Sequence, residues 1–156
     1  MAPAYEELLS EFREFASTAP TAKAVMERIA QRLHEKFTRY NWVGFYLIDP
    51  ANPGYLLVGP YVGSFAPHAR IPLGTGLCGA AATGGRTVVV HDVAKAPNYL
   101  AGSTMVKCEI VVPIFAKGRL AAELDINSYF LGTFTAPEQQ FVENCASLVG
   151  TYLGSR

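Results

Sequence analysis

The sequence predicts an α+β domain, in which a central antiparallel sheet carries the N- and C-terminal helices on one face. Two observations support this class. Apolar residues recur at helical spacing near both ends of the chain, and runs of aromatic and β-branched residues fill its middle. The 156 residues suffice for one domain with its own core. We expect a single domain over 1–156, with helices over 1–40, the sheet and its loops over 41–134, and a helix over 135–154.

The helical segments are predicted from apolar stripes. A first helix is followed by a break at 17–21 (STAPT), and a second helix starts at Thr21. The last helix is predicted to begin at a capping box formed by Thr135 and Glu138 and to run to about Leu153. The stripes are Leu8, Phe12 and Phe15 in the first helix, Val25, Ile29, Leu33 and Phe37 in the second, and Phe141, Cys145, Leu148 and Val149 in the last.

The middle of the chain is predicted to form strands. The first two, 41–50 (NWVGFYLIDP) and 55–66, flank a turn rich in Pro, Asn and Gly and read as a hairpin. A glycine-rich turn leading into a short helix follows over 70–85, and 96–107 is predicted to be a loop. The remaining predicted strands are 87–93, 108–118 and 119–129.

Composition excludes several classes of function. Half of the residues are hydrophobic, which excludes a disordered chain, and 13 basic residues balance 13 acidic ones, which disfavours nucleic-acid binding. We find no apolar run long enough to cross a membrane and no signal-peptide pattern, so we expect a cytoplasmic protein. The three cysteines are too sparse to predict a disulfide framework or a zinc site. A metal site is also not predicted by the spacing of His34, His68 and His91, and no motif predicts a cofactor.

The glycine-rich segment GTGLCGAA (74–81) opens a predicted helix. It lacks the Lys-Ser/Thr ending of a phosphate loop, but the backbone N–H groups of a helix start suit a carboxylate. Alternatively, the glycines only shape the turn. Cys78 lies at this helix start, where a thiolate would be stabilised and a redox role is conceivable; a small buried hydrophobe is the other interpretation.

Polar residues in apolar strands are the strongest candidates for a site. Glu109 begins the run IVVPIF, and Asp125 and Asn127 share one face of the strand LDINS. Buried carboxylates are costly unless they are paired or serve a ligand, although residues at strand ends can also face water. Trp42 and Tyr46 share a face of the first strand and either wall a pocket or pack in the core.

The segments that carry a family resemblance are, in order, NWVGFYL, LVGPYVG, IPLGTGLCGAA, HDV, CEIVVPI and LDINS. Over about residues 40–134 the sequence resembles the GAF-domain free methionine-(R)-sulfoxide reductases. The resemblance implies about six antiparallel strands, helices on one face, a loop-covered pocket on the other, and a homodimer. It also implies a pocket for free methionine sulfoxide, with Trp42 and Tyr46 caging the methyl-sulfoxide end. Glu109 and Asp125 would bind the amino group and assist the sulfoxide oxygen, with Asn127 in place of a second Asp.

The cysteines depart from that family. The family positions ten residues before and twenty-four residues after the loop cysteine fall on His68 and Gly102 here, so the resolving and the attacking thiols are both missing. Cys108 replaces a serine of the family motif and is expected to face away from the pocket, and Cys145 is expected in the core.

Three functions therefore stay open. The first is a non-catalytic domain that retains a pocket for methionine-like small molecules. The second is an active reductase that uses Cys78 as its thiol and an external thiol such as thioredoxin for recycling. The third is a structural or partner-binding domain. We favour the first, because Gly102 cannot supply a nucleophile.

Overall fold

The computed structural model describes residues 2–96, 99 and 103–156. Six strands form one sheet in the order β3-β2-β1-β6-β5-β4, and each neighbouring pair is antiparallel. The strands are β1 (Trp42–Ile48), β2 (Tyr55–Gly63), β3 (Arg70–Pro72), β4 (Val88–Val90), β5 (Cys108–Ala116) and β6 (Arg119–Ser128). The predicted α+β class and antiparallel sheet are confirmed.

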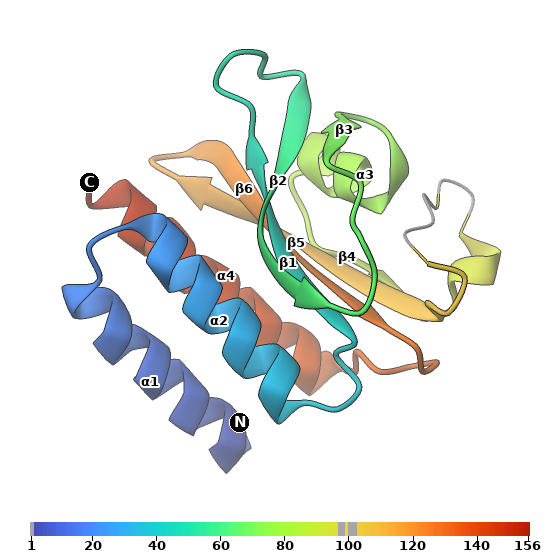
Figure 1. Ribbon diagram of the computed structural model, residues 1–156, viewed down its shortest axis with the longest axis horizontal. Coiled ribbons are helices and arrows are strands. Elements are labelled where there is room, and N and C mark those ends of the chain that lie inside the picture. The colour runs from blue at the N-terminus through green and yellow to red at the C-terminus, as the bar shows by residue number, and fades with distance from the viewer. Residues whose placement is uncertain (1, 97–98, 100–102) are drawn as a thin grey trace.

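Helices cover the sheet unequally. The helices α1 (Pro3–Thr18), α2 (Ala22–Lys36) and α4 (Ala136–Gly154) lie together on one face, and the short α3 (Gly76–Gly84) lies on the other, as Figure 1 shows. A single-turn 3₁₀ helix, η1 (Val93–Lys95), follows β4. None of the helices in the described ranges is both long and apolar enough to span a bilayer.

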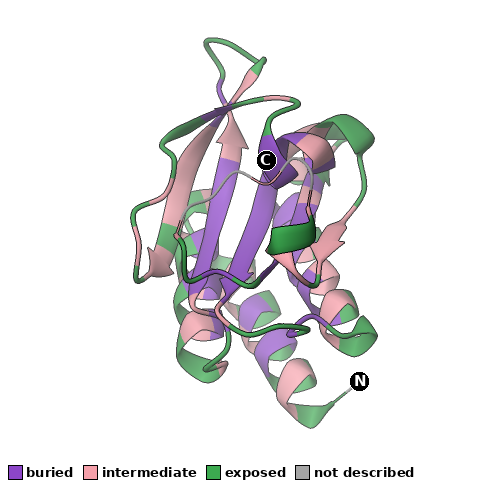
Figure 2. Ribbon diagram, turned by 90° about the vertical axis from the view of Figure 1, so that its right-hand side faces the viewer, coloured by how far each residue is buried: buried purple, intermediate pink, exposed green. Residues whose placement is uncertain are grey.

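Two apolar cores lie on opposite sides of the sheet. The larger one joins α1, α2 and α4 to the helix-facing side and includes the predicted stripe residues Ile29, Leu33, Phe141 and Cys145. The smaller core lies under α3 and consists of Trp42, Tyr46, Leu56, Ile71, Leu77, Cys78, Ala81 and Val111. Between the two cores lie β1, β5 and β6, which are buried over most of their length, as the purple strands of Figure 2 show. The sheet is therefore covered on both faces, and its polar residues under α3 are removed from water.

Three local expectations were wrong. The segment 70–72, expected to be part of a turn, is β3, which pairs with Tyr55–Leu57. The strand expected over 87–93 is limited to Val88–Val90, because the Asp92 carboxylate accepts a hydrogen bond from Ala94 N and starts η1 instead. Thr135 does precede α4, but its side chain makes no capping bond, and Glu138 accepts from the Tyr40 hydroxyl at 2.9 Å.

Candidate functional site

Strand register brings the predicted site residues into rows on the α3 side of the sheet. Trp42 of β1 pairs with Asn127 of β6, and Asn127 pairs with Glu109 of β5. Because side chains alternate between faces, Asp125 shares the face of Asn127. All four residues line one pocket together with Tyr46. The structure thus brings together every pocket residue that the sequence analysis named on these strands.

The indole of Trp42 lies flat over its own strand. An added Cβ at Gly44 would collide with the Trp42 ring, so the glycine is what permits this position. The Trp42 ring stacks on three others, with centroid distances of 6.2 Å to Tyr46, 5.5 Å to Tyr61 and 5.6 Å to Phe65. The result is a rigid aromatic wall on one side of the pocket.

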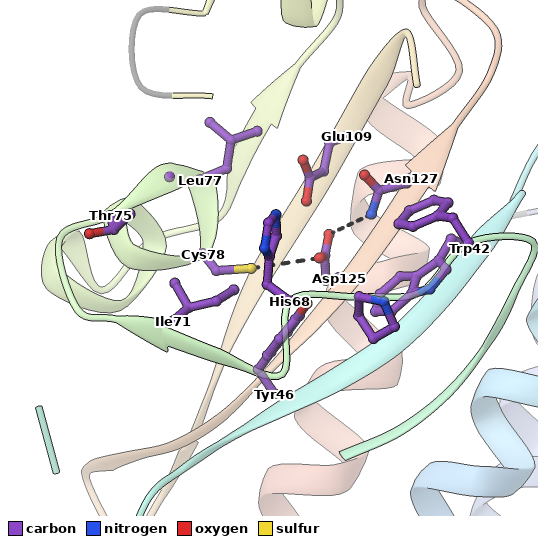
Figure 3. Close-up of a pocket in the computed structure, with 13 residues that line it drawn as sticks. Trp42, Tyr46, His68, Ile71, Thr75, Leu77, Cys78, Glu109, Asp125 and Asn127 are labelled. Atoms are coloured by element: carbon purple, nitrogen blue, oxygen red, sulfur yellow. Dashed lines mark hydrogen bonds between the residues drawn. The ribbon is translucent and has the colours of Figure 1, made fainter. Parts of the chain in front are cut away.

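The rest of the pocket comes from α3 and from the coil between β2 and β3. Figure 3 shows Cys78, on the first turn of α3, directed toward Asp125 on the sheet. The coil contributes Phe65, Pro67 and His68. The cavity that these elements enclose is narrow, about 30 Å³. The full lining is Trp42, Tyr46, Phe65, Pro67, His68, Ile71, Thr75, Gly76, Leu77, Cys78, Glu109, Asp125 and Asn127.

Asp125 is the centre of the polar contacts. It accepts a hydrogen bond from the Cys78 thiol at 3.6 Å on Oδ2 and one from Asn127 Nδ2 at 3.2 Å on Oδ1 (Figure 3). Two donors on one carboxyl group favour its charged form. Among the described residues that line the pocket there is no lysine or arginine. The acids consequently lie in a buried site in which His68 is the one basic side chain among the described lining residues.

Burial dominates the electrostatics of this site. Glu109 is 6% exposed, and its pKa is raised well above the ordinary value, first by desolvation and then by the charge of Asp125. Desolvation also raises the pKa of Asp125, but hydrogen bonds from its neighbours oppose that rise. Of the two acids, Glu109 is therefore the one that burial drives more strongly toward its protonated form, while hydrogen bonds favour the charged form of Asp125.

Cys78 is buried, as one of its two sequence interpretations expected. A helix start was expected to stabilise a thiolate, but the pKa of the Cys78 thiol is raised well above its ordinary value. Desolvation is the largest cause, and the charge of Asp125 is the next. In this environment the thiol form is favoured, and burial outweighs the helix terminus.

Glu123 is a site residue that sequence reasoning missed. It is fully buried on β6, opposite Tyr46 of β1, and neither carboxyl oxygen has a hydrogen-bond partner among the described residues. Desolvation, with a further contribution from Asp125, raises the pKa of Glu123 to about 9. The alternation that identified Asp125 and Asn127 extends back to Glu123, so the signal was present in the sequence.

The other two cysteines both lie in the helix-side core. Cys108 lies in the helix-side core, away from the pocket, where its thiol donates to the Phe130 carbonyl at 3.0 Å. Cys145 lies in the same core. His68 lines the pocket, and Gly102 is outside the described residues.

Comparisons with known proteins agree with this architecture. Residues 21–153 match the GAF domain family model. The chain is 32% identical to the GAF domain-containing protein A of Dictyostelium discoideum, covering 93% of this chain and 89% of that protein. It is 31% identical to the free methionine-R-sulfoxide reductase of Escherichia coli, covering 87% of this chain and 80% of the other.

A solved structure extends the likeness to three dimensions. The free methionine-R-sulfoxide reductase of Neisseria meningitidis, solved in complex with its substrate, superposes with a TM-score of 0.89 at 34% identity. That match covers 96% of this chain and 87% of the other. The chain thus belongs to the GAF-domain family and is a homologue of the free methionine-R-sulfoxide reductases.

Proposed function

We propose that the pocket under α3 binds a free amino acid of the methionine type, including its sulfoxide, and that the chain does not reduce the sulfoxide. The observation that carries the binding proposal is the placement of an aromatic wall beside a buried acid pair with no lysine or arginine in the lining. Relatives of this chain are named for a methionine sulfoxide substrate, which supports the choice of ligand.

The acid pair suits an ammonium group. The pKa of each acid is raised, that of Glu109 the more strongly. We infer that the pair shares one proton and carries one negative charge, which a single ammonium neutralises. The ammonium group also supplies the cation that a buried carboxylate needs. Asn127 would hold Asp125 in position through its 3.2 Å hydrogen bond.

The aromatic wall suits the side chain of such a ligand. Trp42 and Tyr46 present ring surfaces to the cavity, and sulfur packs favourably against aromatic rings, by about 0.3–1.5 kcal/mol per contact. The Trp42 Nε1–H is buried and has no partner among the described residues. A ligand oxygen that accepted from this group would remove the cost of an unpaired donor.

The start of α3 suits the carboxylate of an amino acid. Thr75 makes no side-chain cap, and the first-turn residues Gly76, Leu77 and Cys78 border the cavity. Their backbone N–H groups and the positive helix end favour an anion. This extends the carboxylate interpretation of the glycine-rich segment.

The narrow cavity requires movement. At about 30 Å³ it is smaller than an amino acid, so we infer that the coil over 64–69 shifts outward when the ligand enters. This coil has no strand pairing of its own, and most of its residues are exposed or half-buried. Its displacement would move Phe65 away from Trp42 and leave the sheet, with Trp42 and Tyr46, and α3 in place.

The absence of turnover is inferred from the thiols. Sulfoxide reduction needs a thiolate that attacks sulfur and a second thiol that releases the oxidised product. The resemblance puts these thiols at positions 102 and 68, which are glycine and histidine here. The Cys78 pKa is raised rather than lowered, which disfavours a replacement nucleophile.

One observation favours the alternative, a reductase that uses Cys78. Its thiol borders the same cavity as the aromatic wall. In that case the Cys78 thiolate would attack the sulfoxide sulfur while a buried acid such as Glu109 protonates the sulfoxide oxygen. Methionine would leave, and the oxygen would stay on Cys78 as a sulfenic acid. An external dithiol such as thioredoxin would then displace this oxygen as water and close its own disulfide.

A ligand panel tests the proposal. Free methionine and both sulfoxide epimers are expected to raise the melting temperature of the wild-type protein, and a thioredoxin-coupled assay is expected to show no turnover. Asp125→Asn should weaken binding by about 10–100-fold, because the negative charge of the acid pair is lost and with it a charge-assisted contact of roughly 1.5–3 kcal/mol. Glu27→Gln, on the exposed face of α2, is the control. No shift with any of the three ligands would refute the binding proposal, and wild-type turnover would favour the alternative.

A further inference from the structure

The amino-acid ligand leaves two buried acidic groups without a role. The ammonium uses Glu109 and Asp125, but Cys78 and Glu123 lie beside them. Glu123 is 0% exposed and Cys78 is 5% exposed. Each salt bridge found in the described part of the chain lies elsewhere. A cluster of one thiol and several carboxyls that is buried with no lysine or arginine among the described lining residues offers the ligand types of a metal site.

We propose that Cys78, Glu109 and Asp125 bind a Zn²⁺ ion, and that Glu123 lies behind them as a supporting carboxylate. The sequence analysis expected no metal, because neither the sparse cysteines nor the histidines have metal-binding spacing. The fold brings one ligand atom from each of the three to within 4.8 Å of the others. This inference does not depend on the amino-acid ligand, although the two would compete for the same acids.

The distance between Cys78 and Asp125 fits zinc. Zinc is held at about 2.3 Å by cysteine sulfur and about 2.0–2.2 Å by carboxylate oxygen in a tetrahedral site, which sets the sulfur and oxygen about 3.5 Å apart. Cys78 Sγ and Asp125 Oδ2 are 3.6 Å apart. The cavity of about 30 Å³ also exceeds the roughly 10–15 Å³ that one water needs, and so admits an ion and a water ligand.

Glu123 provides an independent observation. Both of its carboxyl oxygens are buried and lack a hydrogen-bond partner among the described residues. It shares a face of β6 with Asp125, whose charge raises the pKa of Glu123, and it lies close enough to Cys78 for that thiol to lower the pKa. A buried carboxyl next to the three proposed ligands is in the position of a group that orients metal ligands. Supporting groups around a metal typically change its affinity by about 10–100-fold.

The ligand types select the metal. Thiolate and mixed thiolate–carboxylate sets favour Zn²⁺, whereas Mg²⁺ and Ca²⁺ prefer oxygen ligands alone. We therefore expect Zn²⁺ and its optical substitute Co²⁺ to bind, and Mg²⁺ in excess to leave both bound.

The test uses the full chain, reduced and stripped with a chelator. Titration should show one equivalent of Zn²⁺, and Co²⁺ should give a thiolate-to-cobalt charge-transfer band. Cys78→Ser should abolish the band and Cys108→Ser should keep it, since Cys108 lies in the other core. Glu123→Gln should weaken Zn²⁺ binding by about 10–100-fold. Because a variant can lose its fold, the wild-type protein gives a second readout, in which Zn²⁺ protects Cys78 from alkylation as mapped by peptide mass spectrometry.

The outcomes separate the two proposals. Failure of Zn²⁺ to bind, or binding that neither gives the band nor protects Cys78, overturns the metal site. Free methionine is titrated into the metal-free protein in parallel. Methionine binding without Zn²⁺ binding would leave only the proposed function standing, and Zn²⁺ binding without methionine binding would leave only the metal site.

Discussion

The Cys78 thiol donates a hydrogen bond to Asp125 Oδ2 over 3.6 Å, and this contact joins α3 to β6 across 47 residues of sequence. It places the only pocket thiol among the described residues against a carboxylate. The same contact opposes a nucleophilic role, because a neighbouring negative charge disfavours the thiolate. The chemistry expected of this cysteine is therefore that of a buried thiol.

Alkylation measures this directly. We predict that iodoacetamide labels Cys78 of the metal-free native protein far more slowly than a free cysteine at pH 7, because the thiol is buried and its pKa is raised. Asp125→Asn removes the nearest charge and should speed labelling severalfold. Peptide mass spectrometry locates the label. Wild-type labelling as fast as that of free cysteine would mean that the thiol is exposed and activated.

Glu123 should make the stability of the metal-free protein depend on pH. Its pKa of about 9 in the folded state lies above its value in the unfolded state, so the folded state keeps a proton that the unfolded state loses as the pH rises. The stabilisation of the folded state by this proton is complete below about pH 4.5. It is lost progressively as the pH rises toward 9. From this one group the free energy of unfolding should fall by about 3 kcal/mol between pH 5 and 7.5.

The matched variant isolates that effect. Glu123→Gln cannot ionise, so its unfolding free energy, measured in urea with a chelator present, should fall less steeply over this pH range. Glu27→Gln, at an exposed position, should follow the wild-type slope. Parallel slopes for wild type and Glu123→Gln would mean that Glu123 titrates alike in both states.

Gly44→Ala should damage the aromatic wall. The new methyl group collides with the Trp42 ring, and overpacking of this kind typically costs about 1–3 kcal/mol. Ligand binding should fall together with the unfolding free energy. Gly84→Ala is the control, because an added Cβ there meets nothing within 4 Å. Equal stability of Gly44→Ala and wild type would show that Trp42 can move without cost.

Turnover should appear only when the family's thiols are rebuilt. Wild type should not reduce free methionine-(R)-sulfoxide with thioredoxin, and Gly102→Cys with His68→Cys should gain activity. Gly102→Cys alone should give at most one stoichiometric event, unless Cys78 resolves the sulfenic acid. Wild-type turnover that Cys78→Ser abolishes would instead assign the reaction to Cys78.

Much of the fold and part of the site could be predicted from the sequence. Period-two alternation correctly grouped Asp125 with Asn127, and the apolar stripes gave the long helices, because both signals are local. The contact of Cys78 with Asp125 is not local, since it depends on how α3 crosses the sheet. Glu123 was missed although it continues the same alternation. The direction of the Cys78 pKa shift was wrong because the helix terminus is visible in sequence and the burial is not.

The central claim is that the pocket recognises a free amino acid through its ammonium group. Calorimetric titration of the wild-type protein with L-methionine-(R)-sulfoxide and with its N-acetyl derivative tests this most directly. We predict one-site binding of the free sulfoxide and at least about tenfold weaker binding of the acetylated one, because the uncharged nitrogen cannot neutralise Glu109 and Asp125. Equal binding of the two compounds, or no binding of the free sulfoxide, would contradict the account.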